Sequence, residues 1–351
     1  MRVTSAIRGE RIAWGRLARP LALIFVLLPL CLSPAPGRAG VADVLNECIR
    51  IEDDAARLRC YDRKAGRVPE PEPESLSQGP VRAGSDALSY LTRLWELDEE
   101  SRHGKYALKA HHSNYILPYT YNASPNVEQV REDDPARDLK REEVAYQLSL
   151  KVKLWQDVLG EKLDLWFAYT QRSFWQFYNT AESSPFRETN YEPELLLNWR
   201  TDYQIMGVDV RFVNIGLNHQ SNGKSEPLSR SWNRVVANIG LEKDNLSLLI
   251  KGWYRIPESS AKDDNRDIED YLGYGEAHLL YFAGGHRFGV KMRNNMKSTD
   301  NRGSVQVDWS FPLLRRVSGY IQYFNGYGES LLDYNQSVNR IGFGFIIRDW
   351  D

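Results

Sequence analysis

One stretch of alternating residues constrains the fold of this 351-residue chain more than any other feature. From residue 144 to residue 154, every even position is apolar or aromatic, and the positions between them are Ala, Gln, Ser, Lys and Lys. A repeat of two places all the apolar side chains on one face of a β-strand. About ten residues are also what a tilted strand needs to cross a membrane, so this segment predicts a membrane-spanning strand.

The same alternation recurs from about residue 105 to the end of the chain. It predicts about twelve strands, near residues 105–119, 143–154, 162–173, 194–203, 207–220, 231–241, 246–256, 272–283, 286–295, 303–310, 315–324 and 339–348. Long strands without covering helices, in a chain with 10 Trp and 19 Tyr, are typical of an all-β, transmembrane antiparallel β-barrel. A soluble β-sandwich or barrel also alternates, but its strands average about half this length.

The N-terminus has the pattern of a signal peptide. Basic residues precede an apolar run over 21–32, and small residues follow up to Ala39. The run is shorter than the roughly 20 residues that a membrane-spanning helix needs, which disfavours an uncleaved anchor. We therefore expect residues 1–39 to be removed near Ala39, and the mature protein to reach the bacterial outer membrane.

Two short segments separate this signal from the predicted barrel. Residues 40–66 carry apolar positions at helical spacing and predict a small helical appendage. They contain Cys48 and Cys60, which we expect to form a disulfide in an exported protein, with two buried free thiols as the alternative. Residues 67–90 are rich in Pro and Glu and predict a linker, which leaves 91–351 for the barrel.

The charge of the chain excludes one class of partner. Removal of residues 1–39 takes away six Lys and Arg and one Glu, which leaves 39 basic against 46 acidic residues and a formal charge of −7. A nucleic-acid partner would require a basic face, so we expect none. A lipid or small-molecule substrate remains open.

The chemistry is concentrated between residues 215 and 234. His219 and Ser221 are two positions apart, so on a strand they share a face, where an imidazole nitrogen can accept the serine proton. Gly223 and Pro227 then break the strand, and the chain returns through Asn233, whose side-chain oxygen can hold the other ring nitrogen. Ser221, His219 and Asn233 are therefore the candidate nucleophile, base and orienting group.

Strand parity places these three residues on the outer wall. His219 and Ser221 continue the apolar row of Val213, Ile215 and Leu217, while the alternate positions are polar or small. Polar side chains that face lipid are costly unless they have a function. The abundant substrate at that wall is lipid, which favours a lipase.

Other hydrolase patterns are weaker or missing from the sequence. A His-x-Ser pair alone is weak evidence, and the segment from His111 to Asn114 is a rival arrangement, but it lacks a nearby turn with an amide partner. The sequence contains neither a Gly-x-Ser-x-Gly elbow nor a His-Glu-x-x-His zinc motif.

Three segments together resemble a known family, the bacterial outer-membrane phospholipases A. They are Asn218-His-Gln-Ser-Asn-Gly223 continued by Ser229-Arg-Ser-Trp-Asn-Arg234, then Ser183-Ser-Pro-Phe-Arg-Glu-Thr-Asn-Tyr-Glu-Pro193, and Gly326-Tyr-Gly-Glu-Ser-Leu-Leu-Asp-Tyr-Asn335. The resemblance covers roughly residues 100–351. It implies a twelve-stranded barrel and a Ser-His-Asn triad near the outer-leaflet headgroups. It also implies release of fatty acid from the sn-1 or sn-2 position, a requirement for calcium, and activity as a homodimer.

The resemblance also implies which residues hold Ca²⁺. The ligands would be the backbone carbonyl of Lys224, the hydroxyl of Ser229 and a carbonyl at Ser183 from the partner subunit, while a site used by the monomer includes Asp264. This chain has Lys224 and Glu226 where the family has Arg and Asp. A carbonyl ligand tolerates the first change, so the departure bears on calcium affinity alone.

A non-enzymatic outer-membrane pore or structural barrel is the competing hypothesis. In that case the His-Ser-Asn set would be a remnant. A barrel of about twelve strands is narrow enough to be filled by its own side chains, which favours the enzyme.

Overall fold

The computed structural model describes residues 89–347 apart from 161, 262 and 315, together with residues 48–49, 51, 53, 57–58 and 60–62. The predicted signal peptide and residues 67–88 of the predicted linker lie outside this range. The chain divides into two compact units, Met1–Ala83 and Gly84–Asp351. Each unit is considered by itself.

The first unit contains the disulfide. Its described residues are helical at 48–49, 57–58 and 60–62, and Cys48 is bonded to Cys60 with the two Cα atoms 5.6 Å apart. The predicted pairing is confirmed.

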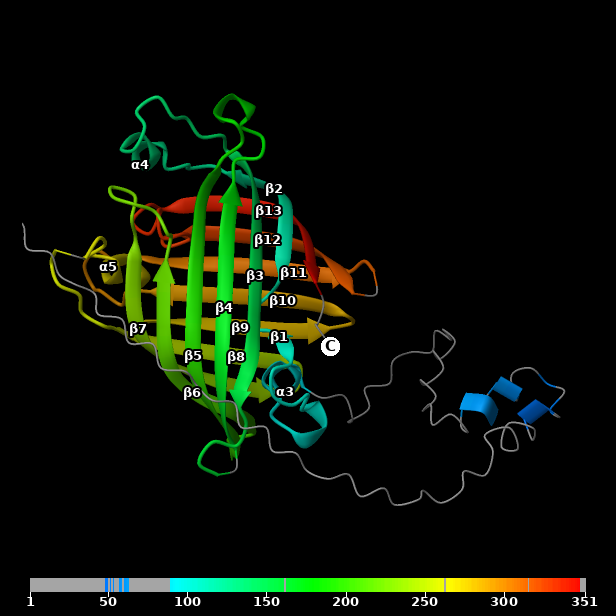
Figure 1. Ribbon diagram of the computed structural model, residues 1–351. Helices are drawn as coiled ribbons and strands as arrows, with labels where there is room; N and C mark the ends of the chain where they lie inside the picture. Colours follow the sequence, from blue (N-terminus) through cyan, green and yellow to red (C-terminus); the bar gives the residue numbers. More distant parts are fainter. Residues whose placement is uncertain are drawn as a thin grey trace, which may run out of the picture. The chain divides into compact units, whose positions relative to one another are not determined.

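The second unit is an antiparallel β-barrel (Figure 1). Its strands are β1 (Leu108–Ala110), β2 (Tyr115–Asn122), β3 (Glu142–Trp155), β4 (Leu163–Trp175), β5 (Phe186–Ile205), β6 (Val208–Ser221), β7 (Ser231–Lys243), β8 (Leu246–Arg255), β9 (Gly275–Ala283), β10 (His286–Asn294), β11 (Gly303–Pro312), β12 (Val317–Gly326) and β13 (Val338–Ile347). From β2 to β13 each strand pairs with the next, and β13 pairs with β2 to close the sheet. The predicted twelve-stranded closed barrel is confirmed, with β1 as a short additional strand.

The first predicted strand, 105–119, is divided in two. Both pieces pair with β3, with Leu108 opposite Val152 and Tyr115 opposite Gln147. Between them, the side chain of Asn114 takes over the backbone pairing at Ser149. Its amide donates to the Ser149 carbonyl at 3.0 Å, and its oxygen accepts from the Ser149 N–H at 2.6 Å. This local replacement keeps both backbone groups of Ser149 paired where residues 111–114 leave the sheet.

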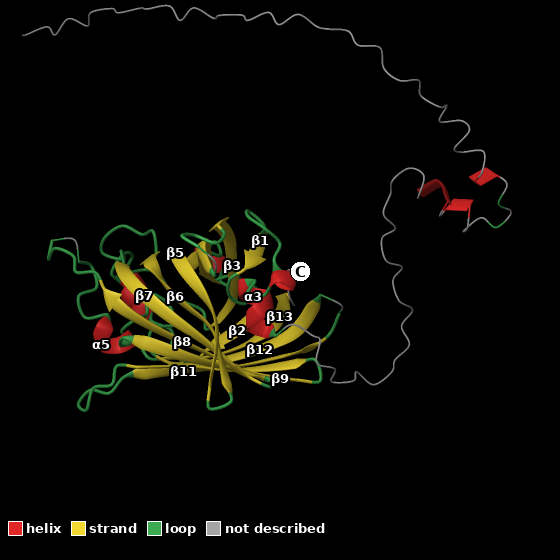
Figure 2. Cartoon of the chain, turned by 90° about the horizontal axis from the view of Figure 1, so that it is seen from below, coloured by secondary structure: helices red, strands yellow, loops and turns green. Residues whose placement is uncertain are grey.

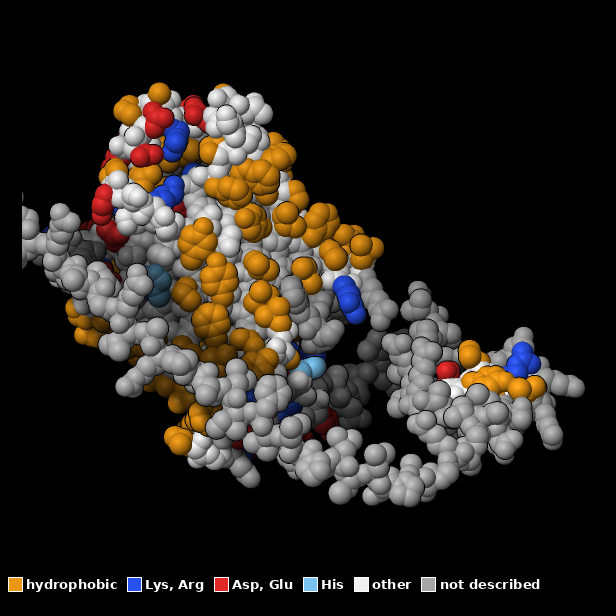
Figure 3. Space-filling model, viewed as in Figure 1, with side chains coloured by type: hydrophobic (Ala, Val, Ile, Leu, Met, Phe, Trp, Pro, Cys, Tyr) orange, Lys and Arg blue, Asp and Glu red, His pale blue; other side chains and the backbone are white. Residues whose placement is uncertain are grey.

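The barrel is apolar outside and polar inside. Ile215 and Leu217 on β6 are about 55% exposed, whereas their neighbours Asn214 and Asn218 are nearly fully buried. Hydrophobic side chains cover the wall that faces the viewer in Figure 3, and charged ones gather at the loops above it. This is the arrangement of a barrel whose outer wall meets lipid.

Short helices and turns lie at the barrel ends. They are α3 (Tyr90–Trp95), α4 (Val127–Arg131), α5 (Glu269–Leu272), η1 (Glu99–Ser101) and η2 (Thr180–Glu182). Figures 1 and 2 place α3 at the end of the barrel opposite α4 and α5. Ser89 and Tyr90, which the sequence assigns to the linker, are the N-cap and first residue of α3. In the described part of the chain, no helix is long and apolar enough to cross a membrane.

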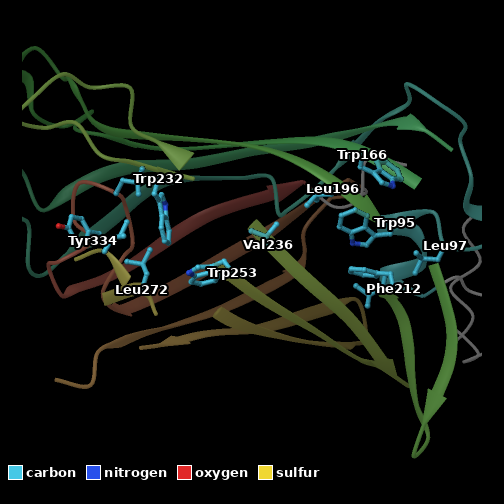
Figure 4. Packing of buried hydrophobic residues seen from close by; sticks show 13 residues of the cluster. Trp95, Leu97, Trp166, Leu196, Phe212, Trp232, Val236, Trp253, Leu272 and Tyr334 are labelled. Carbon is cyan, nitrogen blue, oxygen red and sulfur yellow. The ribbon is translucent and has the colours of Figure 1, made fainter. Parts of the chain in front are cut away.

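Helix α3 closes one mouth of the lumen. Trp95 is only 4% exposed, and its ring lies 5.0 Å from that of Phe212 and 5.9 Å from that of Trp166. The Leu91 N–H donates to Glu242 Oε1 at 2.9 Å, which fixes the start of the helix to β7. Figure 4 shows this aromatic group at one end of the lumen and a second group, around Trp232 and Tyr334, at the other.

The connections between strands differ in length at the two ends of the barrel, which indicates its orientation in the membrane. Connections at the α3 end are short, and three of them are the two-residue turns 206–207, 244–245 and 284–285. Those at the other end are long, and include 123–141, 222–230 and 256–274. Outer-membrane barrels have short periplasmic turns and longer extracellular loops, so the loop lengths predict that the β6–β7 loop lies on the extracellular side.

Candidate active site

The β6–β7 hairpin brings two of the three candidate residues into direct contact. His219 and Asn233 are opposite each other in the pairing of the two strands, and His219 Nδ1 lies 2.9 Å from Asn233 Oδ1. Because the amide oxygen can only accept, the ring carries its proton on Nδ1 in this contact. The Nε2 atom is then the unprotonated ring nitrogen, which can accept a proton from a serine hydroxyl.

Ser221 continues the same face of β6. It lies two residues beyond His219 and opposite Ser231, and all three candidate residues are half-buried on the outer wall. Among the hydrogen bonds of the described residues, none joins Ser221 to His219. Catalytic hydrogen bonds are often long without substrate and shorten when it binds. The position of Ser221 and His219 on the same face of β6 is therefore the geometry that favours their pairing.

The inward face of the hairpin holds the backbone in place. Arg234 donates to Asn218 Oδ1, at 3.0 Å from Nε, and its guanidinium lies 4.0 Å above the Trp232 ring. The Trp232 Nε1–H donates to Gln220 Oε1 at 2.8 Å. These buried contacts alternate with the outward triad residues, so packing in the lumen fixes the strand positions that the triad depends on.

One side chain organises the loop that follows Ser221. The Asn222 amide donates to the Leu228 carbonyl at 2.8 Å, and its oxygen accepts from the Arg230 N–H at 3.0 Å. The strand therefore turns immediately after the nucleophile candidate. Gly223 has a φ of 65°, a left-handed conformation that favours glycine.

A fourth residue, which the sequence does not suggest, contacts Asn233. The Asn233 amide Nδ2 donates to Glu258 Oε1 at 2.7 Å, and Glu258 is half-buried just beyond the end of β8. Glu258 falls outside the alternating segments. The one feature of the sequence that could have drawn attention to it is that it lies three residues after Arg255, the last residue of β8. Its role depends on how β8 pairs with β7, a tertiary contact.

The residues implied for calcium lie on three loops. Ser229 Oγ donates to Asp264 Oδ2 at 2.6 Å, and the Ser231 N–H donates to the other Asp264 oxygen at 3.0 Å. Lys224 turns its ammonium onto the Arg187 carbonyl at 2.8 Å, and burial lowers the pKa of Lys224. Ser183 ends η2 on the β4–β5 loop. The structure thus joins Ser229 to Asp264, while its hydrogen bonds do not join Ser183 to them.

The rival arrangement near His111 faces the lumen. His111 Nε2 lies 2.9 Å from Glu194 Oε2, and the His112 N–H donates to Ser149 Oγ at 3.0 Å. His111, His112 and Glu194 form the one cluster of metal-donor side chains found among the described residues. Lys251 donates to the same Glu194 carboxylate at 2.9 Å, so its positive charge opposes a metal ion there.

Comparison with known proteins gives consistent matches along the barrel. The family model described as Phospholipase A1 matches residues 91–347. Phospholipase A1 of Klebsiella pneumoniae is 40% identical over 244 residues, which span 70% of this chain and 83% of that protein.

Two solved structures match both fold and sequence. The outer membrane phospholipase A of Escherichia coli superposes with a TM-score of 0.67 at 39% identity, over 72% of this chain and 95% of that chain. The Salmonella typhi outer membrane phospholipase, solved as a dimer with bound calcium, gives a TM-score of 0.66 at 38% identity over the same shares.

Proposed function

The chain belongs to the phospholipase A1 family, and we propose that it cleaves phospholipid esters with Ser221 as nucleophile, His219 as general base and Asn233 as orienting group. Membership makes it an outer-membrane β-barrel phospholipase. The observation that carries the residue assignment is the 2.9 Å contact between His219 and Asn233, on the lipid-facing wall beside Ser221.

The proposed chemistry follows from the positions of the side chains. Ser221 Oγ attacks the ester carbonyl carbon while its proton passes to His219 Nε2. The ring then carries a positive charge, and Asn233 Oδ1 holds its Nδ1–H throughout. The same ring returns the proton to the leaving alkoxide. Water repeats the sequence to release the fatty acid and regenerate Ser221.

The substrate assignment rests on where the site lies. The triad candidates are at the extracellular end of the lipid-facing wall, so an ester must reach them from the outer leaflet. A glycerophospholipid there presents its two ester groups near the interface, and we propose cleavage at sn-1 and sn-2.

Calcium and a homodimer complete the proposal. The loop oxygens at Ser229 and Asp264 are hard donors, which suit Ca²⁺. We propose that Ser229 and the Lys224 carbonyl bind the ion at the active site, with Ser183 contributed by the partner, and that Asp264 serves a site in the monomer. When bound, calcium would supply positive charge to stabilise the oxyanion. The Salmonella relative, solved as a calcium-bound dimer, supports this assignment.

The packed lumen argues against the alternative of a passive pore. Trp95 and its neighbours fill one end. Near the other end, Glu143 pairs with Arg187 at 2.6 Å and with Arg340 at 2.7 Å, and all three side chains are buried. Such buried pairs occupy interior space that a channel would need.

Active-site labelling tests the nucleophile. A long-chain sulfonyl fluoride should modify Ser221, because its hydroxyl shares the lipid-facing side of β6 with the proposed base His219, and mass spectrometry of the digested protein locates the label. Ser225 and Ser231 are matched comparators on the same hairpin. Labelling spread over all three serines, or unchanged in His219→Ala, would contradict the assignment.

A further inference from the structure

The orientation of the Asn233 amide depends on a neighbour outside the three candidate residues. The two ends of an asparagine side chain are similar in shape, and a flipped amide would turn its NH₂ group toward the Nδ1–H of His219. Glu258 prevents this, because an ionised carboxylate can only accept. With Nδ2 donating to Glu258 Oε1 at 2.7 Å, the amide oxygen must face His219.

Two contacts fix the chain segment that carries Glu258 beside Asn233. The Ile256 N–H donates to the backbone carbonyl of Asn233 at 2.8 Å, which extends the β7–β8 pairing to the residue before Pro257. On the other side of the loop, Arg255 Nη2 lies 2.6 Å from Asp263 Oδ1. Glu258 therefore projects from an anchored turn.

The charge of Glu258 is directed at the amide. Among the described residues, no lysine or arginine forms an ion pair with this carboxylate, and it accepts its hydrogen bond from Asn233. A neutral amide gives the histidine no full negative charge, unlike the carboxylate of a Ser-His-Asp triad. Glu258 supplies that charge one residue further away.

We propose that Glu258 is a positioning residue of the active site, which locks the Asn233 amide and, through it, stabilises the positive charge that forms on His219. The inference rests on the proposed function. The proton moves only from Ser221 Oγ to His219 Nε2 as Oγ bonds to the acyl carbon. Asn233 and Glu258 exchange no proton and form a chain of two hydrogen bonds behind the ring.

Two substitutions separate the orienting contact from the charge. Glu258→Ala removes both and should lower kcat by about two- to ten-fold, with KM within about two-fold, because the contact matters most when the ring is charged. Glu258→Gln keeps an acceptor oxygen and should fall between Glu258→Ala and wild type. The rate at which a sulfonyl fluoride modifies Ser221 should fall in the same order, and it reports activation of the serine without lipid binding.

A matched control comes from the same loop. Asp270→Asn removes a carboxylate whose ion pair with Lys297 is exposed, so both rates should remain at the wild-type level. Heat-modifiable migration in gels confirms that each variant forms the barrel. Wild-type rates in Glu258→Ala would overturn the inference.

The decisive test is an epistatic one with Asn233→Asp. In the wild-type background, the introduced carboxylate would lie against Glu258, and the repulsion between two like charges should displace it from His219. In the Glu258→Gln background, the glutamine amide can donate to that carboxylate, whose second oxygen accepts from His219. Glu258→Gln should therefore lower the activity of wild type but raise that of Asn233→Asp, by about ten-fold.

The two proposals fail in different ways. A glutamate with only a general structural role would give losses that add, so a further decrease in the double variant would overturn this inference while leaving the triad in place. Absence of hydrolysis in the wild-type protein under all conditions would instead remove the proposed function itself.

Discussion

Replacing Asn233 by alanine should slow lipid hydrolysis without stopping it. The change removes the acceptor 2.9 Å from His219 Nδ1, on a half-buried part of the outer wall. In the resting enzyme this is an ordinary hydrogen bond of about 1 kcal/mol net. In the transition state the ring is charged, and hydrogen bonds to charged groups contribute about 1.5–3 kcal/mol.

That difference sets the expected rate. Each 1.36 kcal/mol corresponds to a factor of ten, so a difference of about 0.5–2 kcal/mol should lower kcat by about two- to thirty-fold. The loss should appear in kcat and leave KM nearly unchanged, because the contact strengthens as charge develops on the ring. Ser221→Ala, which removes the bond-forming atom, should give no detectable turnover.

The assay is steady-state release of fatty acid from phosphatidylcholine in mixed detergent micelles. Barrel integrity is followed by heat-modifiable migration, since Asn233 lies outside the packed lumen. Activity in Asn233→Ala equal to wild type would remove Asn233 from the triad. Activity as low as that of Ser221→Ala would mean that the residue does more than orient the ring.

Two further predictions concern calcium and the aromatic group around Trp95. Ser229→Asn keeps an oxygen but displaces it from Asp264, and it should raise the calcium concentration needed for activity and weaken dimerisation in parallel, because linked binding events are reciprocal. Sedimentation and an activity titration, both against calcium, check this, and a fully active monomer at saturating calcium would refute the shared site. Trp95→Ala should destabilise the barrel by about 3–5 kcal/mol, because it empties a buried aromatic cluster. It should leave kcat within about two-fold. A large loss of turnover in a variant that still forms the barrel would mean that the aromatic group around Trp95 affects the active site.

The strands were predictable because a single repeat determines them. In a membrane barrel every second residue meets lipid, so the alternation around Leu148 is uninterrupted. The predicted limits 143–154 and 246–256 agree with β3 and β8 within one residue. The same parity predicted that His219 and Ser221 face outward, as the structure has them.

Features that depend on distant partners were not predictable. The break between β1 and β2 follows from the pairing of Asn114 with Ser149, and α3 is a six-residue helix that packs against Trp166 and Phe212. Neither has a periodic signal of its own.

The candidate site divides in the same way. Spacing and a hairpin turn suffice to bring His219 to Asn233, but Glu258 reaches Asn233 through the β7–β8 pairing. Glu258, 2.7 Å from the amide, also predicts that an aspartate at position 233 is displaced from His219, which spacing along the chain does not indicate.

The most direct test of the account is hydrolysis by the purified, refolded protein. Fatty-acid release from detergent-dispersed phosphatidylcholine is measured for wild type and Ser221→Ala, each with calcium and with a chelator. We predict release by wild type with calcium, little with the chelator, and none from Ser221→Ala under either condition. Equal release by wild type and Ser221→Ala would contradict the assignment of the nucleophile. No release by a correctly folded wild-type barrel with calcium would favour the non-enzymatic alternative.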